Sequence, residues 1–196
     1  MLFQSSISRT AFMATTLMIV SACSGAPEAG DNSANMMPAE NAAGPAATSV
    51  RAELLDAEGG KKGEVVVLQQ GKDLSVTVSG TGIEPGLHGA HIHMTGACDA
   101  PDFKSAGGHW NPANVQHGLD NPQGAHKGDL PNLEIGSDGN GTLSYTVSDA
   151  TIEGGAGALM DEDGAAFVIH AGEDDMKSDP AGDAGSRVAC GVFSAG

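Results

Sequence analysis

Short segments in which every second residue is apolar recur along the chain from residue 50 onward. In 74–78, for example, leucine and valine alternate with serine and threonine, a pattern typical of a strand with one buried face. Turns that contain glycine separate these segments, including 58–60, 71–73 and the Asp-Gly pair at 138–139. The pattern predicts strands at residues 50–54, 64–68, 74–78, 91–93, 133–135, 142–147, 166–170 and 188–192.

Strands this short and this closely spaced predict an all-β fold, an antiparallel sandwich or barrel. The 29 glycines and the low aromatic content of 4% agree with a protein rich in turns. The polar stretch 95–131 is too long for a simple connection between two strands. Because long loops on a rigid sheet commonly carry function, we expect the functional site there.

The first 22 residues are typical of a signal peptide. Arg9 precedes an apolar run at 11–20 that is too short to span a bilayer comfortably. The run ends in the sequence Val-Ser-Ala-Cys at 20–23, which resembles the lipobox of bacterial lipoproteins, so we predict that Cys23 is lipidated. Ordinary cleavage before Cys23, which would leave a free thiol, is the alternative. Ser24 after the cysteine favours the outer membrane of a Gram-negative cell over the inner one, with the protein in the periplasm.

Residues 23–48 are predicted to form a flexible linker, because they hold alanine, glycine, proline, asparagine and serine but almost no large apolar residue. Such a segment would hold a folded domain clear of the membrane. The domain itself is expected at 49–196.

The net charge of −16 is spread over a chain without a basic cluster, which argues against a nucleic-acid partner. An acidic surface repels an anionic substrate unless a local positive group compensates for it. Two cysteines remain beyond Cys23, and in an exported domain Cys98 and Cys190 most simply pair with each other. Two buried free thiols are the alternative.

All seven histidines fall between residues 88 and 170, and six of them lie within 88–126. His91 and His93 share one face of a predicted strand, so both rings can reach one metal ion. A single His-x-His pair is weak support for a metal site, but this concentration is hard to explain by packing. Imidazole nitrogens suit copper and zinc, and one carboxylate among histidines is ordinary for zinc.

Four segments together resemble the copper,zinc superoxide dismutase family. They are 88–93, 109–112, the spacing of His117, His126 and Asp129, and 182–192. The resemblance extends over about residues 50–193. It implies a Greek-key antiparallel β-sandwich, or flattened barrel, with long metal-binding loops.

The resemblance also implies a role for each residue of the site. The implied copper ligands are His91, His93, His109 and His170. The implied zinc ligands are His109, which bridges the two metals, and His117, His126 and Asp129. Arg187 and His109 would be the catalytic residues, with Arg187 attracting the anion. Beyond the ligands, Asp174 would orient two ligand histidines, His88 would tie loop backbone, and Cys98 and Cys190 would form a disulfide.

The implied reaction converts superoxide to oxygen and hydrogen peroxide by redox cycling of copper, which would protect the space outside the cytoplasm. A non-catalytic copper-binding or copper-storage module on the same scaffold is one alternative. A structural β-sandwich that binds zinc alone is another. The sequence leaves the existence of a homodimer open.

Overall fold

The computed structural model describes residues 48–155 and 157–196. The predicted signal peptide, Cys23 and all but the last residue of the predicted linker lie outside these ranges. Within them, no helix is both long enough and apolar enough to cross a membrane.

The predicted strands are all present in the structure, most of them extended by one to three residues at one or both ends. Their bounds are β1 Ser49–Leu55, β2 Lys61–Gln70, β3 Asp73–Thr81, β5 Ala90–His93, β6 Leu133–Ile135, β7 Asn140–Val147, β8 Ala166–His170 and β9 Arg187–Val192. Two short strands were not predicted, β4 (Gly86–His88) and β10 (Ser194–Ala195). Neither is long enough to show an alternation. A single 3₁₀ turn, η1 (Lys104–Ala106), lies in the long loop after β5.

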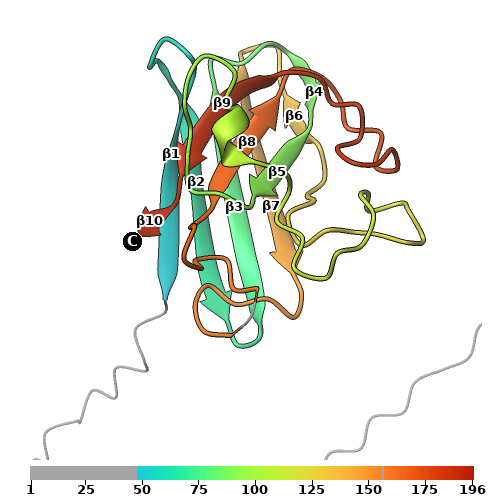
Figure 1. The fold of residues 1–196 in the computed structure, drawn as a ribbon. Coiled ribbons are helices and arrows are strands. Elements are labelled where there is room, and N and C mark those ends of the chain that lie inside the picture. The colour runs from blue at the N-terminus through green and yellow to red at the C-terminus, as the bar shows by residue number, and fades with distance from the viewer. Residues whose placement is uncertain (1–47, 156) are drawn as a thin grey trace, which may run out of the picture. The chain divides into compact units, whose positions relative to one another are not determined.

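The main sheet has the strand order β5-β8-β9-β1-β2-β3-β7, and all of its pairs are antiparallel (Figure 1). β10 pairs with β1 outside this path, and β4 pairs with β6 in a separate two-stranded sheet. Strands from opposite ends of the order contribute to one core, with Ile92 of β5 and Val147 of β7 in the same buried cluster. The sheet therefore curls around its core. The all-β antiparallel prediction is confirmed.

Burial follows the alternation that predicted the strands. In β1 and β3 the buried residues alternate with more exposed ones, so each of these strands has one core face. β8 is buried at all five positions. Its Phe167 and Ile169 pack into the main core, whereas Ala166 and Val168 belong to a second cluster with Phe103 and Cys190. β8 is therefore buried on both faces, and the loop that follows β5 packs against the face that carries Ala166 and Val168.

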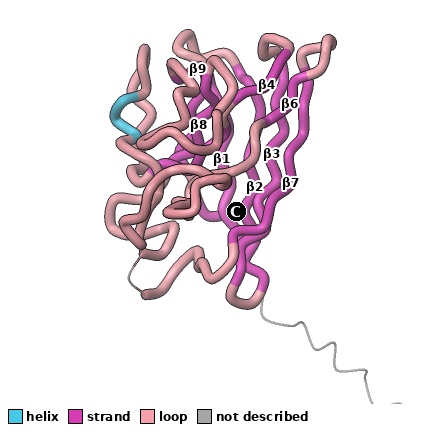
Figure 2. The backbone as a smooth tube through the Cα atoms, turned by 90° about the vertical axis from the view of Figure 1, so that its right-hand side faces the viewer, coloured by secondary structure: helices cyan, strands magenta, loops and turns pink. Residues whose placement is uncertain are grey.

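Much of the 94–132 connection (yellow-green) and the 171–186 connection (red) extend from the same side of the strands in Figure 1, and Figure 2 shows most of the loop chain on the side away from β3 and β7. Close backbone contacts hold these two connections together. Gly118 has a φ of +110°, and a Cβ there would lie 2.1 Å from the carbonyl oxygen of Met176. Only glycine fits this position, because the backbone conformation and the close approach both exclude a side chain.

Candidate metal centre

Four buried histidines converge from three parts of the chain. His91 and His93 lie on β5, His170 ends β8, and His109 lies in the 94–132 connection. The antiparallel pairing sets His91 opposite Val168 and His93 opposite Ala166, and His93 also forms an isolated bridge with His109. Each of the four rings offers one ligand atom, and these atoms lie within 4.8 Å of one another. We call these residues the four-histidine cluster.

One nitrogen of each of these rings is used by the protein. The Nε2–H of His91 donates to Asp174 (2.6 Å), and Nδ1 of His109 faces Asp129 (2.8 Å). The Nδ1–H groups of His93 and His170 donate to backbone carbonyls, at 2.9 and 3.2 Å. The other nitrogen of every ring is buried and has no hydrogen-bond partner. The hydrogen bonds donated by His91, His93 and His170 fix the tautomer of each ring, so that its other nitrogen keeps a lone pair for a metal ion.

The protonation state of these four rings also favours metal binding. Burial lowers the pKa of His91 to about 3, of His93 to about 2 and of His170 to about 4. Burial also lowers the pKa of His109. All four rings are therefore neutral near pH 7, which is the form that binds a metal ion.

A second cluster surrounds the carboxylate of Asp129. Its Oδ1 lies 2.8 Å from Nδ1 of His109, 3.0 Å from Nδ1 of His117 and 3.2 Å from Nδ1 of His126. Backbone N–H groups of Gly118 and His126 donate to its Oδ2, both at 2.9 Å. Burial opposes charge on Asp129, but the contacts with the three rings hold the pKa of its carboxyl well below the usual range.

The spacing of these four atoms fits zinc. Ligand atoms about 2.0 Å from a tetrahedral zinc ion are about 3.3 Å apart. This is close to the 2.8–3.2 Å from Asp129 Oδ1 to the three ring nitrogens and to the 3.5 Å between Nδ1 of His109 and Nδ1 of His126. The Nε2–H of His126 donates to the Val115 carbonyl, and Nε2 of His117 contacts Asp174. The Nδ1 atoms of these two rings therefore face the Asp129 carboxylate, an arrangement that a bound cation stabilises.

His109 belongs to both clusters. Its Nδ1 faces Asp129, whereas its Nε2 is the partnerless nitrogen in the four-histidine cluster. A single imidazole ring thus connects the two candidate metal positions.

Asp174 connects them a second time. Its carboxylate accepts hydrogen bonds from His91 at 2.6 Å and from His117 at 3.0 Å, so it orients one ring of each cluster. Burial works against charge on His117, but hydrogen bonds to Asp129 and Asp174 raise the pKa of its ring to about 9. His88 lies apart from both clusters, because its ring nitrogens face the backbone carbonyls of His170 and Glu84, each at 2.8 Å.

Some supporting residues were not predicted. The Asn132 side chain exchanges two hydrogen bonds with the backbone of Asp174, at 2.8 and 2.9 Å. Asp179 accepts the backbone N–H of His117 at 2.8 Å. These contacts join positions 42 and 62 residues apart, so no local pattern in the sequence points to them.

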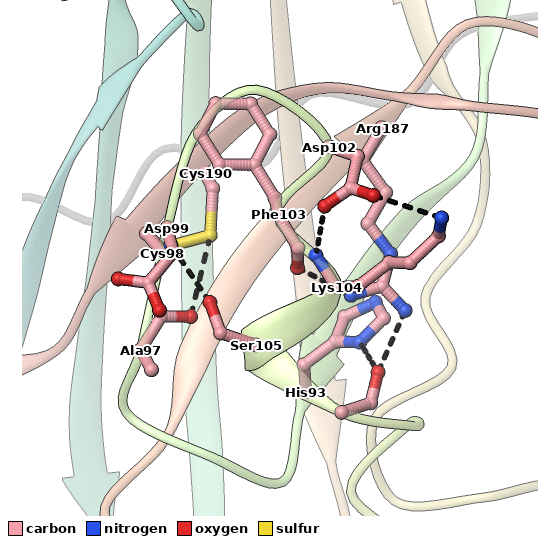
Figure 3. The surroundings of a disulfide bond; sticks show 11 residues. His93, Ala97, Cys98, Asp99, Asp102, Phe103, Lys104, Ser105, Arg187 and Cys190 are labelled. Carbon is pink, nitrogen blue, oxygen red and sulfur yellow. Dashed lines mark hydrogen bonds and ion pairs between the residues drawn. A yellow bond between two sulfur atoms is a disulfide. The ribbon is translucent and has the colours of Figure 1, made fainter.

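A pocket of about 560 Å³ opens onto the four-histidine cluster, with His93, His109, His170 and Arg187 in its lining. Arg187 donates to the backbone carbonyls of Phe103 and Gly107, each at 2.6 Å (Figure 3). The Gly107 carbonyl also accepts the hydrogen bond of His93.

Both carbonyl groups lie in the 94–132 connection, a few residues after Cys98. Cys98 is joined to Cys190 of β9 by a disulfide across 92 residues of sequence (Figure 3). The predicted pairing of these two cysteines is confirmed.

Residues 61–193 match the family described as copper/zinc superoxide dismutase (SODC). The chain belongs to this family. A copper-zinc superoxide dismutase of Aquifex aeolicus (strain VF5) is 43% identical over 143 residues, covering 72% of this chain and 85% of its own length. One of Caulobacter vibrioides is 42% identical over 139 residues, covering 69% and 80%.

A superoxide dismutase-like protein of Bacillus subtilis (strain 168) is 37% identical over 162 residues, covering 81% of this chain and 83% of its own. The crystal structure of a SOD-like protein from Bacillus subtilis matches the fold with a TM-score of 0.69 at 39% identity. That match covers 72% of this chain and 96% of the other. The family therefore includes proteins named as enzymes and proteins named only as similar to them.

Proposed function

We propose that this protein is a copper,zinc superoxide dismutase that converts superoxide to oxygen and hydrogen peroxide. The observation that supports this most strongly is the set of four buried imidazole nitrogens without partners, one of them on a ring shared with a second cluster. Copper would be held by His91, His93, His109 and His170. Zinc would be held by His109, His117, His126 and Asp129.

The donor sets suit these two metals. Neutral imidazole is a good ligand for copper, and three histidines with one carboxylate are ordinary for zinc. Bound copper would supply the one-electron chemistry that oxidises one superoxide and reduces a second. Zinc has no redox chemistry, so its site would provide structure and a fixed positive charge.

The residues around the pocket have two tasks in this reaction. His109 lines the pocket, and its Nε2 has no hydrogen-bond partner, so it can hold a proton and give it to the departing peroxide whenever that nitrogen is free. Arg187 is the one lysine or arginine among the described residues that line the pocket. Its hydrogen bonds go to neutral carbonyls, so its charge stays available to attract an anion into a protein of net charge −16.

The alternative is a copper-binding or copper-storage module without catalysis. This alternative is considered because the Bacillus subtilis relative is named only as superoxide dismutase-like. A storage module needs the four-histidine cluster but has no use for a shared ring, a second cluster or a free cation at the pocket. The presence of all three favours the enzyme.

We further propose that the enzyme is exported to the periplasm and attached to the outer membrane through lipidated Cys23, where it removes superoxide outside the cytoplasm. The support is the sequence of residues 1–23. Incorporation of labelled palmitate into the full chain, and its loss in Cys23→Ser, tests this.

The deciding experiment measures superoxide dismutase activity and metal content of the full chain, with and without added copper. We expect copper-dependent activity at one copper and one zinc per chain, and loss of that activity in His109→Ala. Full loading with both metals but no activity would refute the enzyme proposal and support the storage module.

A further inference from the structure

Met94 lies at the mouth of the pocket. It follows His93 directly in the chain, it lines the same pocket, and it is 51% exposed. A single exposed apolar side chain is ordinary on a protein surface, so this exposure shows only that the sulfur is accessible.

The sulfur also lies next to groups that orient the site. A Cβ built on Gly107 would lie 3.2 Å from Cγ and 3.8 Å from Sδ of Met94. The carbonyl of Gly107 accepts the hydrogen bonds of both His93 and Arg187. The thioether is thus a near neighbour of the peptide group that positions a ligand ring and the guanidinium.

Apart from the histidines, the other donor side chains that line this pocket carry oxygen: Asn111, Asn114, Asp161 and Asp179. Carboxylate and carbonyl oxygens suit hard cations, whereas a thioether selects Cu(I). Met94 is the one sulfur donor among the described residues that line the pocket.

A thioether has a further advantage beside Arg187. A carboxylate at position 94 would attract a copper ion but would also repel the superoxide that Arg187 attracts. The thioether is neutral, so it can bind Cu(I) without adding a further negative charge to a pocket that already holds Asp161 and Asp179. Methionine is unbranched and flexible, so its sulfur can take several positions at the pocket, which His93 and His170 also line.

We propose that Met94 is a Cu(I) capture ligand, which binds Cu(I) at the pocket mouth and passes it to the four-histidine cluster. The transfer is an exchange of ligands: a bond from Cu(I) to sulfur is replaced by bonds to imidazole nitrogens, and no group is oxidised or reduced. This inference rests on the proposed copper site.

The test follows copper uptake by the zinc-loaded, copper-free full chain under anaerobic conditions. Cu(I) is supplied as its coloured bicinchoninate complex, and loss of colour reports the transfer. We expect Met94→Leu to take up Cu(I) about tenfold more slowly, an effect the size of losing one supporting contact at a metal site. Uptake of Cu(II) and the final copper content should stay unchanged.

Met160→Leu is the matched control, because Met160 is partly buried against the core and does not line the pocket. Met94→Glu is a second variant, which replaces the soft donor by a hard one and should slow Cu(I) uptake while Cu(II) uptake is kept or accelerated. Equal Cu(I) rates in wild type and Met94→Leu, with full loading, would overturn the capture role alone. Equal slowing of Cu(I) and Cu(II) would overturn it as well. Failure of the wild type to bind copper would overturn both this role and the proposed copper site.

Discussion

Gly182 lies where a methyl group would strike the carboxylate that joins the two clusters. Its φ is +63°, and a Cβ there would lie 1.8 Å from Oδ1 of Asp174 and 2.8 Å from Nε2 of His117. Oδ1 also accepts the backbone N–H of Met176 at 2.7 Å. The carboxylate therefore cannot turn away from the new methyl group without losing hydrogen bonds, and Gly182→Ala should displace it.

Two contributions set the size of the effect. Alanine in a left-handed conformation costs about 1–2 kcal/mol. Loss of one hydrogen bond to a charged group costs about 1.5–3 kcal/mol. We expect Gly182→Ala to lower the free energy of unfolding of the metal-free protein by about 3–4 kcal/mol. Because Asp174 orients rings of both clusters, affinity for copper and for zinc should fall by about 10–100-fold.

Gly71→Ala is the control, because it introduces the same backbone strain as Gly182→Ala without the steric clash with a neighbouring group. Gly71 has nearly the same φ, +64°, but a Cβ there meets nothing within 4 Å, so this variant should lose only about 1–2 kcal/mol and keep its metal affinities. Denaturant unfolding of the metal-free protein with the disulfide intact, together with competition titrations for each metal, gives both quantities. The reasoning is refuted if the two variants lose the same stability and Gly182→Ala binds both metals normally.

Three further predictions concern the charge, the protonation and the disulfide of the site. Arg187→Gln should reduce the dismutation rate at low salt by about tenfold or more and flatten its salt dependence; Lys177→Gln, an equal charge change at an exposed side chain outside the pocket lining, should do neither. The pKa of His117 is raised from 6.5 to about 9, so its proton stabilises the metal-free fold fully below pH 6.5 and this stabilisation is lost as the pH rises through 9. Zinc must displace that proton, so apparent zinc affinity should rise about tenfold per pH unit up to pH 9, and a flat affinity between pH 7 and 9 in calorimetric titrations would contradict this. Replacing Cys98 and Cys190 by serine should cost about 2–5 kcal/mol in denaturant unfolding. It should also lower the dismutation rate, because the loop that the disulfide anchors holds Arg187, and full activity in the folded double variant would contradict this positioning role.

The strands were predictable because one buried face imposes an alternation that the sequence shows directly, as in β3. The concentration of histidines predicted a metal site, whereas the resemblance to the family implied which of them are ligands, set His88 apart and added Asp129. The structure brings the implied ligands together in two clusters. Which metal each residue binds stays a prediction.

The supports of the site were not predictable. Asn132, Asp179 and Gly182 act through contacts between the two long loops. Their residue types are common in any loop, and only the folded arrangement shows that each has a partner far along the chain. β4 and β10 were missed because their three and two residues carry no alternation of buried and exposed positions.

His109 and Asp174 each touch both clusters, which would make the two proposed metal positions a single thermodynamic unit. A metal that orders these side chains in one cluster would prepare them for the other, so we expect binding at the two positions to be coupled. By reciprocity, the factor by which zinc strengthens copper binding equals the factor by which copper strengthens zinc binding. A substitution near either metal therefore acts on both affinities, and a chain that has lost zinc would also be a weaker competitor for copper.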